Sequence, residues 1–217
     1  MNKFIKLPLI LSSITFLTSG LLMLSESATY EKIAEQKKRL LLASLEQLIP
    51  QQLHDNDLTK NTIEINEENL LGHRKVQTIY VGTLNDITTV TAIPVTARNG
   101  YSGDIDIMVG IRSNGEITSV KILEQHETPG LGDLIEAHKS DWIKQFPNQS
   151  FDTVQAKDWK VKKDGGQFDQ ITGATISPRA VTIAIKKALL YHQHHFNTSQ
   201  SKENTEIEID TNKEKKP

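Results

Sequence analysis

The sequence Asp104-Ile105-Asp106-Ile107-Met108-Val109-Gly110-Ile111 carries the clearest structural signal in this chain of 217 residues. Isoleucine and valine alternate with polar or small residues, and this period of two predicts a β-strand. The turn Ser113-Asn114-Gly115 follows, and Ile117, Val120 and Ile122 supply the apolar positions of a return strand. The two runs therefore predict an antiparallel hairpin.

Further elements lie on both sides of the hairpin. Residues 76–80 and 90–96 are rich in β-branched residues and predict two more strands, and residues 159–163 predict another. Residues 130–145 predict a turn followed by short helical pieces. Strands outnumber helices and no regular βαβ alternation is present, so we predict an α+β domain with a mainly antiparallel sheet.

One long helix is predicted near the end of the domain. Ser177 is a good N-cap and Pro178 a good first helical residue. A stripe of apolar residues with a period of 3.6 follows, and it should face the sheet. The stripe consists of Val181, Ala184, Ile185, Ala188 and Leu189.

The first part of the chain has a different character. Residues 7–25 contain no charged residue and are long enough to cross a bilayer as a transmembrane helix, although a cleaved signal peptide is the alternative. Residues 26–50 predict a helical stalk that ends at Pro50. Lys and Arg residues stand on both sides of the apolar segment, so the charges alone leave its orientation open.

The polar composition of residues 197–217 predicts a disordered tail, because too few apolar residues are present to form a core. Residues 51–196 then remain as one domain of ordinary size.

The chain has 25 Lys and Arg against 27 Asp and Glu, and we expect no nucleic-acid partner because no basic face is evident. It has no cysteine, which excludes disulfides, thiol nucleophiles and cysteine-ligated metal clusters.

Other catalytic signatures are weak. His192 and His195 share a helix face, but no carboxylate stands beside them at ligand spacing, so no metal site is predicted. The Gly130-Leu131-Gly132 string lacks the third glycine of a dinucleotide fingerprint. Asp104 and Asp106 are interpreted as the solvent side of the hairpin. We predict no catalytic residue.

The most informative stretch is Asp169-Gln170-Ile171-Thr172-Gly173-Ala174-Thr175, just before the predicted helix. Its small residues permit close approach of a bulky group, and a helix start favours a phosphate. The alternative is a loop whose hydroxyls only cap the helix. On these grounds Thr172 and Thr175 both remain candidates for the phosphate site.

This stretch resembles the flavinylation motif of the FMN-binding domain family, Asp-x-x-Ser/Thr-Gly-Ala-Thr, at every defined position. The resemblance implies that FMN is joined through its phosphate to Thr175 as a phosphoester. It also implies that an FMN transferase makes this bond and reads Asp169, Thr172, Gly173 and Ala174 as motif residues.

Two upstream strings, Gly100-Tyr101-Ser102-Gly103-Asp104-Ile105 and His126-Glu127-Thr128-Pro129-Gly130-Leu131-Gly132, are similar to the G subunit of the Rnf/Rsx ion-translocating electron transport complex. The similarity covers nearly the whole chain. It implies that the second string borders the flavin or its approach. The residues concerned are Glu127, Thr128, Gly130 and Leu131.

The resemblance implies a flavoprotein subunit that relays electrons to and from neighbouring subunits of a membrane complex. It further implies a single-pass protein of the bacterial inner membrane, with residues 1–6 in the cytoplasm and residues 51–196 in the periplasm. Two alternatives stay open. One is the related C subunit of the sodium-translocating NADH:quinone reductase, and the other is a membrane-anchored assembly module without redox chemistry.

Overall fold

The computed structural model divides the chain into two compact units, residues 1–43 and residues 44–217. In the first unit, residues 11–16 are helical and exposed. The parts of the chain that the structure describes are residues 11–16, 18–20, 36, 41, 43–46 and 48–196.

None of the described helices is both long enough and apolar enough to cross a bilayer. The predicted span at residues 7–25 and the predicted stalk at residues 26–50 lie partly outside the described residues. The predicted segments 1–6 and 197–217 lie wholly outside them. These four assignments stay predictions.

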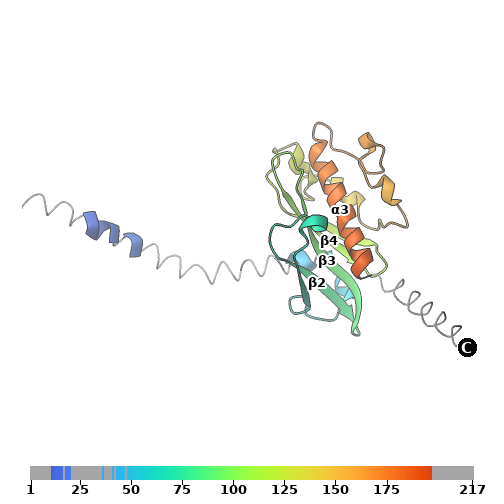
Figure 1. Ribbon diagram of the computed structural model, residues 1–217, viewed down its shortest axis with the longest axis horizontal. Helices are drawn as coiled ribbons and strands as arrows, with labels where there is room; N and C mark the ends of the chain where they lie inside the picture. The colour runs from blue at the N-terminus through green and yellow to red at the C-terminus, as the bar shows by residue number, and fades with distance from the viewer. Residues whose placement is uncertain are drawn as a thin grey trace, which may run out of the picture. The chain divides into compact units, whose positions relative to one another are not determined.

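The second unit is built on a five-stranded antiparallel sheet in the order β1-β2-β3-β4-β5, so each strand pairs with its neighbour in the sequence (Figure 1). The predicted hairpin forms β4 and β5, and the α+β class is confirmed. The strands are β1 (Thr62–Ile65), β2 (Gln77–Leu84), β3 (Ile87–Ala97), β4 (Ile105–Arg112) and β5 (Ile117–Glu124).

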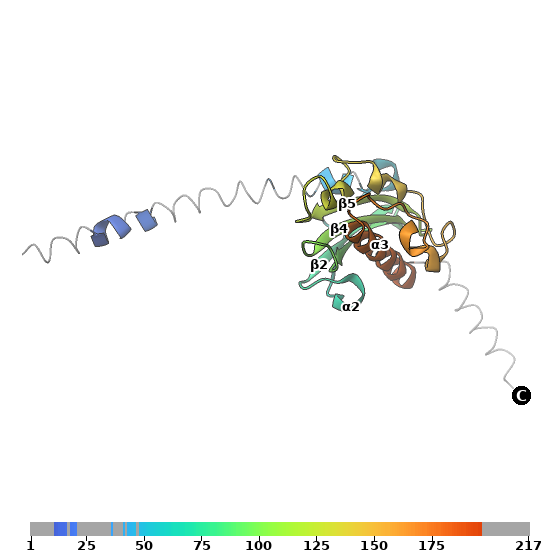
Figure 2. The same cartoon turned by 90° about the horizontal axis from the view of Figure 1, so that it is seen from above.

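The long helix α3 (Ile176–His195) packs across β3 and β4 on one face of the sheet, as Figures 1 and 2 show. Neighbouring strands present the pairs Ile93 with Val109 and Val95 with Ile107 to the core, and all four residues are buried. The five residues of the predicted apolar stripe of α3 are also buried, which confirms the predicted orientation of the helix.

The opposite face of the sheet is covered near Gly110 by residues that precede Pro50. Leu45, Leu48 and Ile49 are fully buried, and the Thr118 hydroxyl donates a 2.6 Å hydrogen bond to the Leu48 carbonyl. A Cβ atom on Gly110 would lie 2.6 Å from the same carbonyl oxygen. The alternation through β4 predicts that this face is solvent-exposed. That prediction is only partly right, because a distant segment packs on the face.

Most of the shorter elements lie between β5 and α3, whereas η1 precedes β1 and α2 lies between β1 and β2. The predicted strand at residues 159–163 is wrong: Val161 makes a single bridge to Phe168, between two short turns of 3-10 helix. Trp159 and Phe168 instead point into an aromatic cluster with Phe146. The short helices are η1 (Gln51–Leu53), α2 (Glu68–Leu71), η2 (Gly132–Ile135), η3 (Trp142–Gln145), η4 (Ala156–Asp158) and η5 (Lys162–Asp164).

Candidate functional site

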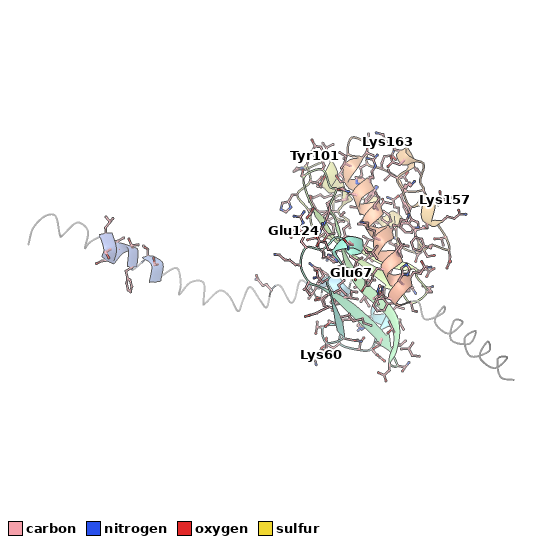
Figure 3. The ribbon with its side chains drawn as sticks, viewed as in Figure 1. Lys60, Glu67, Tyr101, Glu124, Lys157 and Lys163 are labelled. Atoms are coloured by element: carbon pink, nitrogen blue, oxygen red, sulfur yellow. The ribbon has the colours of Figure 1, made fainter. Side chains whose placement is uncertain are left out.

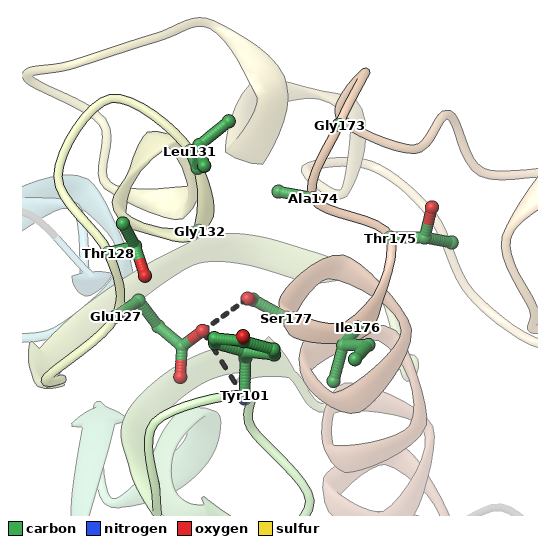
Figure 4. A pocket seen from close by; sticks show the side chains of 10 residues that line it. All are labelled: Tyr101, Glu127, Thr128, Leu131, Gly132, Gly173, Ala174, Thr175, Ile176 and Ser177. Carbon is green, nitrogen blue, oxygen red and sulfur yellow. Dashed lines mark hydrogen bonds between the residues drawn. The ribbon is translucent and has the colours of Figure 1, made fainter.

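A pocket of about 310 Å³ lies where the β3–β4 loop, the loop after β5 and the start of α3 meet (Figure 4). This volume lies at the lower end of the range typical of small-molecule sites. Figure 3 places Tyr101, which lines the pocket, at one end of the domain and Lys60 at the other. The lining residues are Tyr101, Glu127, Thr128, Leu131, Gly132, Gly173, Ala174, Thr175, Ile176 and Ser177.

Glu127 is the buried acidic residue of this pocket, with 5% of its surface exposed. Its carboxylate accepts hydrogen bonds from the amides of Tyr101 and Ser102, at 3.3 and 3.0 Å, and from the hydroxyl of Ser177 (Figure 4). Three donors satisfy the group where water has little access. The carboxylate thereby joins three segments that are far apart in the sequence.

Two glycines make room for this carboxylate. A Cβ atom on Gly132 would lie 2.7 Å from Oε2 of Glu127, and one on Gly100 would lie 2.8 Å from Oε1. Both distances are below normal van der Waals contact. Close packing around Glu127 therefore explains Gly100 in the first upstream string and Gly132 in the second.

Thr175 is placed by a tight turn over residues 171–174. The amide of Ala174 donates a 3.1 Å hydrogen bond to the carbonyl of Ile171, and Gly173 has φ +83°. A positive φ at the third position of a turn favours glycine. After this turn, Thr175 lies at the N-cap position of α3. The side chain of Thr175 makes no capping hydrogen bond there.

The predicted N-cap role of Ser177 is therefore wrong. Ser177 is the second residue of α3, and its hydroxyl donates to Glu127 rather than to the helix backbone. Pro178 still lies in the first turn, where a missing amide hydrogen has no cost. The capping alternative for the motif hydroxyls finds no support at Thr175.

The two motif threonines have different surroundings. Thr175 lines the pocket, whereas Thr172 is exposed in the turn and is absent from the lining. In Figure 4 the side chain of Thr175 points away from Glu127 and Tyr101.

Asp169 lies outside the pocket lining, and hydrogen bonds to its backbone amide and carbonyl fix its position. Its amide donates to Oε1 of Gln145 at 2.7 Å, and its carbonyl accepts a 2.6 Å hydrogen bond from the indole of Trp142. Its exposed carboxylate pairs with Lys162 at 2.6 Å. These contacts anchor the start of the motif to η3 and η5.

Two ion pairs involve residues close in sequence to the pocket residues but outside the pocket lining. Arg179, one turn along α3 from Thr175, donates to Asp164 at 2.7 Å, and this hydrogen bond lowers the pKa of Asp164. Lys139 lies 2.8 Å from Asp133, and their hydrogen bond lowers the pKa of Asp133 and raises that of Lys139. The described residues include no group of three or more side chains placed to hold a metal ion.

Of the four residues predicted to border a flavin, Glu127, Thr128 and Leu131 line the pocket. Gly130 is absent from the lining and, with φ +74°, shapes the turn of the loop. Their contacts with a flavin stay predictions. The pocket adds Tyr101, Gly132, Ile176 and Ser177, of which only the first two fall in strings that the sequence had singled out.

The profile of the FMN-binding domain family matches residues 100–190, which span the pocket. The G subunit of the ion-translocating oxidoreductase complex of Shewanella piezotolerans is 42% identical over 194 residues, 89% of this chain and 92% of that protein. The chain belongs to this G-subunit family. The corresponding protein of Vibrio cholerae is 42% identical over 187 residues, 86% of this chain and 89% of that protein. The predicted resemblance is confirmed.

A solved structure is also similar to this member of the G-subunit family. The crystal structure of Shewanella oneidensis NqrC has a TM-score of 0.43 and 18% sequence identity, and it covers 62% of this chain and 69% of that chain.

Proposed function

We propose that this protein carries FMN bound covalently through its phosphate to Thr175 and relays electrons within an ion-translocating oxidoreductase complex. The family supports an FMN domain and a subunit of such a complex. The observation that carries the site assignment is that Thr175 lines the pocket and makes no capping hydrogen bond. When bound, FMN supplies reversible electron uptake and release.

The residues present fit the group. Tyr101, Leu131 and Ile176 line the pocket and are 69%, 42% and 42% exposed, which offers apolar surface to a flat aromatic ring. Gly173 and Ala174 leave space beside Thr175. The first-turn amides of Ile176 and Ser177 have no intrahelical acceptor, and with the helix dipole they favour a phosphate there.

Maturation and location complete the proposal. Thr172 and Gly173 are exposed, so an FMN transferase can reach the motif from solvent. A membrane span at residues 7–25 would anchor the domain at the periplasmic face, beside the other subunits of the complex. Covalent attachment suits that compartment because it prevents loss of FMN where none is available for rebinding.

A C subunit of the sodium-translocating NADH:quinone reductase is less well supported, because the curated relatives at about 40% identity are G subunits. The alternative of an assembly module without redox chemistry predicts no covalent flavin. Under that alternative, Thr175→Ala would only remove a side chain at the start of α3.

Denaturing gel electrophoresis separates these proposals. The full chain, produced with its FMN transferase, should give a band with flavin fluorescence, and Thr175→Ala should abolish it. Thr172→Ala should reduce labelling without abolishing it, because Thr172 serves recognition of the motif. A non-fluorescent native chain, or a fluorescent Thr175→Ala variant, contradicts the assignment.

A further inference from the structure

We propose that Glu127 is a positioning residue that holds the flavin pocket in shape and places a fixed negative charge beside the flavin, which lowers the reduction potential of the flavin. This inference rests on the proposed function, because it concerns the same pocket.

The hydrogen bonds of Glu127 fix the relative positions of two segments of the pocket wall. Oε1 accepts from the amide of Ser102, and Oε2 accepts from the amide of Tyr101 and the hydroxyl of Ser177. Ser177 lies two residues after Thr175 on the first turn of α3. Glu127 therefore holds the attachment residue at a set position relative to Tyr101 on the facing loop.

The carboxylate of Glu127 is stabilised by hydrogen-bond donors. All three hydrogen bonds are donated to the carboxyl oxygens, the arrangement that an ionised carboxylate requires. No ion pair among the described residues includes Glu127, whereas buried Asp133 on the neighbouring turn has Lys139. Among the described residues that line the pocket, Glu127 alone has a charged side chain. Dipoles, rather than a cation, stabilise this charge.

A negative charge in the pocket wall opposes electron uptake by a group held beside it. The interaction is strong because Glu127 is almost fully buried, so solvent and salt screen it weakly. The hydroxyl dipole of Ser177 partly offsets the charge. Removing the charge should therefore raise the midpoint potential of the flavin, and removing only the hydroxyl should lower it.

The test uses the full chain with covalent FMN and compares three variants by redox titration of the flavin absorbance. Glu127→Gln removes the charge and keeps the length of the side chain, although its amide nitrogen cannot accept a hydrogen bond as a carboxyl oxygen does. The midpoint potential of this variant should shift upward. Ser177→Ala keeps the carboxylate of Glu127, and the midpoint potential of the flavin in this variant should shift downward. Glu116→Gln removes one carboxylate at the far end of the β4–β5 hairpin, so its potential should match that of the native protein.

Opposite shifts separate a charge effect from simple loosening of the pocket, which would move both variants in the same direction. An unchanged potential in Glu127→Gln, or shifts of the same sign in the two pocket variants, overturns the inference. If Glu127→Gln yields no folded flavoprotein, an unchanged or raised potential in Ser177→Ala overturns it. A native chain without covalent flavin contradicts the proposed function instead, as the fluorescent gel reveals independently.

Discussion

The hydroxyl of Ser177 donates a hydrogen bond to Oε2 of Glu127, although the two residues are 50 positions apart in the sequence. This contact joins the first turn of α3 to the loop that follows β5. Because Thr175 stands two residues before Ser177, the geometry of the proposed attachment site depends on the loop as much as on its own motif.

Close packing around Glu127 predicts that Gly132→Ala damages the pocket. The added methyl group would lie 2.7 Å from Oε2 of Glu127 and 2.6 Å from Oγ of Ser177. We expect a loss of about 1–3 kcal/mol in the free energy of unfolding, measured by urea denaturation, together with weaker flavin labelling.

Gly115→Ala is the matched control, since Gly115 has φ +87° but open space around it. It should lose about 1 kcal/mol through backbone strain and keep full labelling. Equal labelling of the two variants would show that packing around Glu127 does not shape the pocket.

The segment before Pro50 should contribute to the stability of the domain. Leu48 is fully buried against the sheet, so Leu48→Ala should lower the free energy of unfolding by about 2–5 kcal/mol. Ile87→Ala, at a residue that is 70% exposed, should change it by less than about 0.5 kcal/mol. Urea denaturation of both variants measures the difference, and equal stabilities would contradict the packing of Leu48.

The Asp133–Lys139 pair predicts a stability difference that depends on pH. The pKa of Asp133 is lowered below 3.8, so its contribution is present above that value and is lost as pH falls through the folded-state pKa. The pKa of Lys139 is raised above 10.5, so its contribution is lost as pH rises through the folded-state pKa. Lys139→Met should therefore lower Tm most between about pH 5 and about pH 9.

Thermal unfolding across pH checks this window. Lys144→Met is the control, because Lys144 pairs with Asp141 on the surface and such pairs contribute little. A destabilisation by Lys139→Met that stays constant down to the acid limit would refute a role for the ionised pair.

Buried His192 should make the protein less stable in mild acid. Burial lowers its pKa to about 4, and its Nε2 has no hydrogen-bond partner in the described part of the chain. Between pH 6.5 and 4 the unfolded state binds a proton that the folded state does not, so stability falls as pH falls, by up to about 3 kcal/mol.

His192→Leu should flatten this decline in a Tm series over the same pH range, whereas exposed His138→Gln should not. Some slope should remain, because burial also lowers the pKa of His73. An unaltered slope in His192→Leu would assign the acid sensitivity to other groups.

Local patterns in the sequence predicted the regular elements well. The period of two in β4 and the period of 3.6 in α3 each indicate which face of the element is apolar. The apolar face of β4 and the apolar face of α3 are both buried, as expected. The strand predicted at residues 159–163 did not form, because Trp159 packs in an aromatic cluster and Val161 makes only a single bridge to Phe168. The motif at residues 169–175 could be read from the sequence because it is a short contiguous string, and the attachment of FMN to Thr175 stays a prediction.

What the sequence determined by itself is therefore local: the hairpin, the apolar stripe of α3 and the string that ends at Thr175. Only the tertiary structure decided that the hydroxyl of Ser177 donates a hydrogen bond to Glu127 instead of capping α3. The same holds for the packing of Leu48 on the sheet at Gly110. The physical reason is that a buried polar or apolar group takes its partner from whatever chain packs against it. The partners here lie 50 positions apart for Ser177 and Glu127, and 70 for Leu48 and Thr118.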